Sequence, residues 1–155
     1  MTRFLTASTP QEMRSFGESL GKRCGSGDVI ILIGELGGGK TTLVQGIAQG
    51  VGIMDRITSP TFVIARVHEH PAGGPSLVHV DAYRLADSSE LDDLDLPVES
   101  SVTVIEWGEG IADHLTEERL EISIIAVDDT DARQLRMTGT DRWTTDMAEI
   151  ADVLA

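Results

Sequence analysis

A glycine-rich run in the first third of the chain has the spacing of a phosphate-binding loop. Residues Gly34–Thr41 read GELGGGKT and fit the pattern G-x-x-x-x-G-K-[ST]. Glycines let backbone N–H groups close around phosphate oxygens where a Cβ would obstruct them. In such a loop the lysine, here Lys40, reaches the β- and γ-phosphates, and the next hydroxyl, here Thr41, is a ligand of Mg²⁺. These residues predict that the chain binds a nucleotide.

The segments on either side of the run have the patterns of the strand and the helix that such a loop joins. Residues 28–33, DVIILI, form a continuous apolar and β-branched stretch, as in a strand buried on both faces. From Thr41 to Val51, apolar residues recur three or four positions apart, as on one face of a helix. The loop would lie at the helix N-terminus, which favours an anion. This context argues against the alternative of an ordinary glycine-rich turn.

Two further expected strands end in carboxylates. Residues 77–81, LVHVD, end at Asp81, and residues 101–106, SVTVIE, end at Glu106. A P-loop NTPase needs an acidic group near Mg²⁺ in addition to the loop itself. Ligands of open α/β sheets bind outside the carboxyl ends of the strands, so both carboxylates could face the triphosphate. The alternative is that they only end strands at the protein surface.

Other residues have chemistry of lower specificity. Residues 58–61, TSPT, lie where loops that sense the γ-phosphate are found, although alone they indicate only a polar turn. Trp107 follows Glu106 and could stack on a ligand, with a buried core tryptophan as the alternative. His68 and His70 flank a glutamate, and we interpret them as part of a solvated loop in preference to a zinc site.

The rest of the chain alternates expected helices and strands. Thr9, Pro10 and Glu12 have the spacing of a capping box with proline at the first helical position, so a helix is expected from there to about Cys24. The remaining expected elements are strands over 61–67, 77–81, 101–106, 119–124 and 133–137, a short acidic helix over 88–96 and a closing helix over 146–155. The first two strands could form a hairpin across the turn at 71–75. The alternating strands 119–124 and 133–137 are interpreted as half-exposed edge strands.

These elements predict one domain, residues 1–155, with a three-layer α/β fold of the P-loop NTPase type. Its sheet is expected to be mixed but mainly parallel, with flanking helices and antiparallel edge strands. The net charge of −14, with only two lysines and scattered arginines, argues against direct, strong binding of nucleic acid. The absence of an apolar membrane span or secretory signal, and the single Cys24, agree with a cytoplasmic protein.

Four motifs together resemble the TsaE family, also called YjeE. They are Gly34–Thr42 (GELGGGKTT), Thr58–Phe62 (TSPTF), His79–Arg84 (HVDAYR) and Val104–Trp107 (VIEW), and their order and spacing match that family over nearly the whole chain. The resemblance implies a bacterial P-loop ATPase, with ATP or ADP and Mg²⁺ as cofactors, that is needed to make N6-threonylcarbamoyladenosine at position 37 of tRNAs reading ANN codons. It implies that the chain acts with TsaD and TsaB in a TsaBDE complex, supports the turnover of that complex, and meets tRNA only through it.

The resemblance also implies roles for individual residues. The phosphate cradle would comprise Leu36, Gly37, Gly38, Gly39, Lys40, Thr41 and Thr42. Asp81 would take the second acidic position, and Glu106 would be an Mg²⁺ ligand or activate water, so the direct metal ligand stays open between them. Thr61 would lie in a switch-like loop and Trp107 beside the site, with Ser8, Thr9 and Arg133 lining an adenine pocket.

Other functions of a P-loop remain to be weighed. A small-molecule kinase would need a lid over an acceptor, for which residues 68–75 are a weak candidate. A guanine-specific switch is excluded, because the chain has no Asn-Lys-x-Asp reader and Asp81 is followed by AYR in place of x-x-Gly. A nucleotide-sensing adaptor that scarcely hydrolyses ATP would use the same residues as an ATPase. No arginine finger is evident, and since such a finger contributes roughly 10³–10⁵ in rate, unassisted hydrolysis is expected to be slow.

Overall fold

The computed structural model describes residues 2–34, 39–58, 64–107, 110, 112, 115–140 and 143–154. Within these ranges the strands are β1 (Thr2–Ala7), β2 (Val29–Gly34), β3 (Ala65–His68), β4 (Ser76–Asp81), β5 (Ser101–Glu106), β6 (Leu120–Ala126) and β7 (Arg133–Gly139). The helices are α1 (Pro10–Lys22), α2 (Lys40–Val51), α3 (Ser88–Asp92) and α4 (Trp143–Ala151), with short 3-10 turns at Val98–Ser100 and Asp152–Leu154. Predicted site residues Leu36, Gly37, Gly38 and Thr61 lie outside the described residues.

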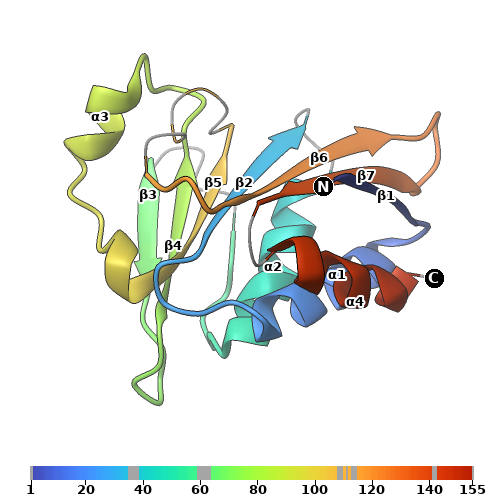
Figure 1. Cartoon of the computed structure of the whole chain (residues 1–155), viewed down its shortest axis with the longest axis horizontal. Helices are drawn as coiled ribbons and strands as arrows, with labels where there is room; N and C mark the ends of the chain where they lie inside the picture. The colour runs from blue at the N-terminus through green and yellow to red at the C-terminus, as the bar shows by residue number, and fades with distance from the viewer. Residues whose placement is uncertain are drawn as a thin grey trace.

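All of these strands join one mixed sheet in the order β1-β7-β6-β2-β5-β4-β3 (Figure 1). Strands β6, β2, β5 and β4 are parallel to one another, whereas β7, β1 and β3 are added antiparallel. The expected α/β fold with a mixed sheet is therefore confirmed. The four residues Val29–Leu32 of β2 are fully buried, because β2 lies in the centre of the sheet and is covered on both faces.

One expectation about the edges of the sheet was wrong, and one edge strand was not anticipated. The segments expected as edge strands became β6 and β7, which lie inside the sheet, and the edge beyond them is formed by β1. Their alternating pattern indicates that one face of each strand is covered by helices and the other face is solvated. An interior strand and an edge strand can both have this pattern, so it does not predict the position of a strand in the sheet. Strand β1 itself was missed, since five of its six residues are at least partly exposed and no apolar run marks it.

Several element limits also moved. The predicted hairpin is confirmed by the antiparallel pairing of β3 with β4, although β3 begins at Ala65 and residues 61–63 lie outside the described residues. Helix α3 ends at Asp92, before the expected Leu96, and α1 ends at Lys22. Thr9 caps α1 as predicted, accepting a hydrogen bond from the Glu12 N–H at 3.1 Å.

The sheet separates two apolar cores. Helices α1, α2 and α4 lie together on one face (Figure 1), where Phe16, Leu43 and Trp143 are fully buried. On the other face α3 contributes Leu91, which packs with Val80 and other sheet residues. No helix in the described ranges is long and apolar enough to cross a membrane.

Glycines allow α1 and α2 to approach each other backbone to backbone. A Cβ on Gly21 of α1 would lie 2.2 Å from the Ile47 carbonyl oxygen of α2, and one on Gly46 would lie 2.3 Å from the carbonyl oxygen of Arg14. These distances are far below a van der Waals contact, so only glycine fits. The close packing holds α2, which begins at the end of the glycine-rich run, against α1.

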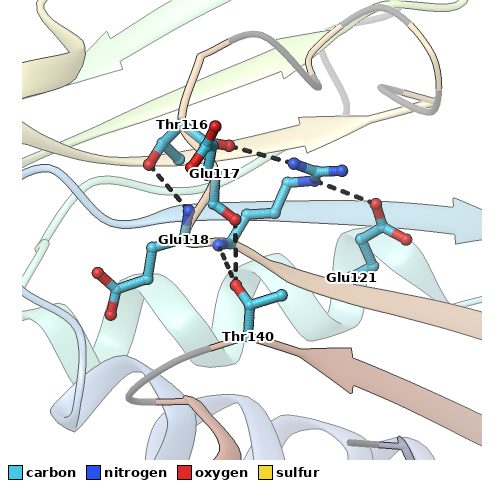
Figure 2. A network of polar contacts seen from close by, with 6 residues as sticks. Thr116, Glu117, Glu118, Glu121 and Thr140 are labelled. Atoms are coloured by element: carbon cyan, nitrogen blue, oxygen red, sulfur yellow. Dashed lines mark hydrogen bonds and ion pairs between the residues drawn. The ribbon is translucent and has the colours of Figure 1, made fainter.

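Polar contacts fasten the start of β6 to the end of β7 (Figure 2). Thr140 donates its hydroxyl to the Glu117 carbonyl oxygen at 3.1 Å. Arg119 donates to the Thr116 carbonyl oxygen and to the Glu121 carboxylate, each at 3.2 Å. The network anchors the chain where it enters β6, the strand that pairs with β2 and so supports the strand before the glycine-rich run.

Candidate functional site

The predicted strand and helix around the glycine-rich run are both present. Strand β2 ends at Gly34, and α2 begins at Lys40 after Gly39, whose φ of 102° lies in the left-handed region that favours glycine. Among the described residues, no side chain caps the N-terminus of α2. Its first N–H groups are therefore not engaged by a capping side chain, as an anion-binding helix terminus requires.

Lys40 is the buried cation of this site. Its side-chain Nζ donates to the Gly34 carbonyl oxygen at 2.5 Å and lies 3.8 Å from the centre of the Trp107 ring. Burial lowers the pKa of Lys40, and the negative charges of Glu106 and Asp81 act in the opposite direction. The structure therefore brings together the lysine and the two carboxylates that the sequence singled out.

The two carboxylates are neighbours at the carboxyl ends of their strands. Asp81 of β4 is paired with Glu106 of β5 in parallel register. They share a face of the sheet with Leu77 and Val104, which pack in the core beneath the helices, so both carboxylates are on the α2 side. Glu106 is only 3% exposed, which excludes the alternative of a solvated strand end for this residue.

His79 is a member of this group that the sequence analysis missed. Its ring is fully buried, and Nε2 lies 2.5 Å from the Glu106 Oε2 atom. His79 and Asp81 point to the same face because they are two residues apart in β4. The available signal was a polar residue at an inward position of an otherwise apolar strand, two residues before an acidic strand end.

Trp107 borders the site from an unusual backbone conformation. Its backbone φ is 61°, a conformation that residues other than glycine seldom adopt. Holding a residue in this conformation costs about 1–3 kcal/mol of free energy. The Trp107 and Tyr83 rings pack edge to face, with 5.4 Å between ring centroids. The ammonium group of Lys40 lies over the face of the Trp107 ring. Trp107 is partly exposed, so the alternative of a core tryptophan is wrong. A strained aromatic residue held over a buried cation is typical of a functional site.

A small cavity lies on the other side of the α2 N-terminus. It has a volume of about 120 Å³ and is lined by Thr9, Pro10, Met13, Gly39, Thr42, Asp131 and Arg133. The structure thus brings Thr9 and Arg133, two of the residues expected near the base, to the residues flanking Lys40. Ser8 does not line this cavity, and its N–H donates to the Glu12 carboxylate at 2.6 Å.

The histidines of the expected loop and Cys24 lie outside this site. His68 is buried in β3 and contacts the Asp55 carboxylate at 3.0 Å, which corrects its expected place in a solvated loop. The reason is that β3 extends to His68 and turns its side chain inward. Among the described residues, no group of three or more His, Cys, Asp or Glu side chains could hold a metal ion on its own. Cys24 is partly buried, with its thiol donating to the Leu20 carbonyl oxygen.

Comparisons with known proteins agree in pointing to one family. The family described as "Threonylcarbamoyl adenosine biosynthesis protein TsaE" matches residues 7–135. Proteins named "tRNA threonylcarbamoyladenosine biosynthesis protein TsaE" are similar to the chain: one from Streptomyces coelicolor is 51% identical over 86% of this chain and 95% of its own length. Another, from Mycobacterium tuberculosis, is 44% identical over 83% of each chain.

The fold is also similar to that of a solved structure. The crystal structure of YdiB from Bacillus subtilis superposes with a TM-score of 0.78 at 27% sequence identity, covering 98% of this chain and 95% of that one. The similarity therefore extends over the whole sheet and its helices, including the elements that carry Lys40, Asp81 and Glu106.

Proposed function

The chain belongs to the TsaE family of threonylcarbamoyladenosine biosynthesis proteins, and we propose that in this role it is a Mg²⁺-dependent ATPase acting with TsaB and TsaD. The observation that carries the proposal is the meeting of Lys40, Asp81 and Glu106 at the N-terminus of α2. A glycine-flanked helix start, a buried lysine and paired carboxylates are the parts that P-loop ATPases use.

The donor set fits a magnesium ion shared with a bound nucleotide. Mg²⁺ in phosphate-transfer sites is held by one or two carboxylates or hydroxyls together with phosphate oxygens and water. Asp81 and Glu106 supply adjacent carboxylates, and Thr41 lies in the first turn of α2. When bound, the ion would neutralise charge on the β- and γ-phosphates.

Individual residues of the chain would have different roles in binding the nucleotide and in its hydrolysis. Lys40, which now donates to the Gly34 carbonyl oxygen, would turn to the phosphates and stabilise the charge that develops as the terminal phosphoryl group leaves. Of the two carboxylates, the one not bound to the ion would orient the attacking water. Thr9 and Arg133 would border the base or ribose, because their cavity adjoins the helix start.

The turn between β3 and β4 is poorly placed to serve as the lid of a kinase. Residues 69–75, the turn between β3 and β4, precede β4, whereas Asp81 ends it. A strand of six residues separates the two ends by roughly 17–20 Å, so this turn lies away from the site. A lid over an acceptor would have to come from another segment.

Slow hydrolysis that partners accelerate is the expected behaviour. We would measure Mg²⁺-dependent ATP hydrolysis by the purified chain, alone and mixed with TsaB and TsaD, with Lys40→Ala as the inactive reference. A slow rate that rises clearly in the mixture is the expected result. Turnover near 10 s⁻¹ without partners, about the median for enzymes, would contradict the partner-assisted mechanism. A rate of hydrolysis that is the same with and without TsaB and TsaD would contradict the proposed role in the complex.

A further inference from the structure

His79 occupies a position where an apolar residue would be expected. It lies in the middle of β4, is fully buried, and is paired in register with Val104. The residue two positions earlier on the same face, Leu77, is aliphatic and belongs to the helix-side core. Burying an imidazole costs free energy unless its polar atoms are hydrogen-bonded, so the presence of His79 requires an explanation.

Its only hydrogen bond among the described residues identifies what it does there. Nε2 lies 2.5 Å from Glu106 Oε2, whereas Nδ1 is buried and has no partner in the described part of the chain. A carboxylate oxygen can only accept, so the Nε2–H group is the donor of this hydrogen bond. The ring therefore uses its Nε2–H donor on Glu106.

The two carboxylates of the site are held in the same manner. Asp81 Oδ1 accepts a hydrogen bond from the Tyr83 N–H at 3.0 Å, and Glu106 Oε2 accepts one from His79. In each case the hydrogen bond found among the described residues engages one oxygen of the carboxylate. Glu106 has the longer side chain with more rotatable bonds, so it needs a rigid donor to hold one rotamer.

We propose that His79 is a positioning residue that fixes the Glu106 carboxylate through Oε2 and so presents Oε1 to the magnesium ion or the attacking water. This inference rests on the proposed ATPase function. The imidazole suits the task because its ring is closely packed in the sheet and has only two side-chain torsions. Partners that orient a ligating or catalytic carboxylate typically contribute roughly 10- to 100-fold in metal affinity or activity.

Three variants separate positioning from packing. His79→Leu fills the space without a donor, and His79→Gln keeps a donor at a comparable distance from the backbone. The matched control is His68→Leu, because His68 is also a buried histidine next to a carboxylate, Asp55, but lies outside the site. Thermal unfolding of each variant shows whether it is folded.

The first readout is the affinity for ADP by calorimetry, with Mg²⁺ and with EDTA, followed by kcat and KM for ATP. We expect kcat of His79→Leu to fall roughly 10- to 100-fold. The increase in ADP affinity that Mg²⁺ provides should fall by a similar factor, whereas the affinity for ADP in EDTA should be unchanged. His79→Gln should stay within an order of magnitude of the wild type, and His68→Leu should match it. A His79→Leu protein with wild-type kcat and Mg²⁺ dependence would overturn the proposal.

The second readout begins with the wild-type protein. The ¹⁵N spectrum of the imidazoles in the wild-type protein should show one buried ring with its hydrogen on Nε2, and this signal should shift in Glu106→Gln. A His79 ring with hydrogen on Nδ1 alone would overturn the positioning role, whereas His68, whose Nδ1 faces the Asp55 carboxylate, is expected to carry its hydrogen there. Failure of the wild type to bind or hydrolyse ATP would overturn the ATPase function itself, which distinguishes that failure from one confined to His79→Leu.

Discussion

Asp81 and Glu106 end adjacent parallel strands side by side, with the ammonium group of Lys40 close enough to interact with both. By formal charge, two carboxylates and one ammonium leave this group one negative charge in excess. Neighbouring carboxylates repel each other, so a divalent cation placed between them and a phosphate would relieve that repulsion. The arrangement is therefore suited to binding a metal–nucleotide complex, and each partner can be tested separately.

Replacement of Lys40 by methionine should weaken binding of Mg²⁺·ATP by roughly 10- to 100-fold or more, because a hydrogen bond to a charged group contributes about 1.5–3 kcal/mol. The matched control is Lys22→Met, the chain's other lysine, whose side chain is 66% exposed and pairs only with Glu18 in the described contacts. Calorimetric titration with a non-hydrolysable ATP analogue measures both. Equal affinities for the two variants would rule out a phosphate-binding role for Lys40.

Replacement of Glu106 by glutamine should spare nucleotide binding but lower kcat by roughly 10²–10⁴, the usual contribution of a residue that activates the nucleophile. Glutamine keeps the shape and can still accept a hydrogen bond from His79, so folding should be preserved. Glu121→Gln, which alters a partly exposed carboxylate next to Arg119, is the control. Normal hydrolysis by Glu106→Gln would show that this carboxylate is not needed for the chemistry.

Nucleotide binding should change the fluorescence of Trp107. Lys40 lies over its ring at 3.8 Å, and movement of the ammonium group to the phosphates would remove a charge from the indole face. The second tryptophan, Trp143, is fully buried in the α4 core and should not respond. A titration with Mg²⁺·ADP should therefore alter the emission of the wild type and leave Trp107→Phe unchanged. A response that survives in Trp107→Phe would contradict the movement of Lys40.

The close contact of α1 with α2 should not tolerate a methyl group. Gly21→Ala would place Cβ 2.2 Å from the Ile47 carbonyl oxygen, so the helices must separate, at a cost of about 1–3 kcal/mol. Gly25→Ala is the control, because nothing lies within 4 Å of the Cβ it would add. Urea unfolding measures both free energies. A Gly21→Ala protein as stable as Gly25→Ala would contradict the backbone contact.

The stability of the nucleotide-free protein should depend on Lys40 at alkaline pH. The pKa of Lys40 is below its ordinary value of 10.5 because burial disfavours the ammonium form. Between the folded and the ordinary pKa, the unfolded chain binds this proton more than the folded protein does, so the free energy of unfolding rises with pH. The difference in unfolding free energy between wild type and Lys40→Met should therefore increase as the pH approaches 10.5. A falling difference would contradict the pKa shift.

Much of the fold was open to prediction because it depends on local patterns. The strand before Gly34, the helix after Lys40 and the acidic strand ends at Asp81 and Glu106 were all expected in their observed places. The β3–β4 hairpin was also expected from its turn. What was missed depends on pairing between distant segments: β1 has almost no apolar run, and it forms an edge only because β7 lies beside it.

By itself, the sequence determined the chemical types present and the family, since a glycine-rich loop with lysine and two acidic strand ends are defined by residues close together in the chain. Only the tertiary structure decided how these groups act on one another. The register of β4 with β5 brings His79 to Glu106, and the turn after β5 lays Trp107 against Lys40. Such contacts join residues far apart in the chain and depend on packing and strand register, which local sequence patterns do not encode.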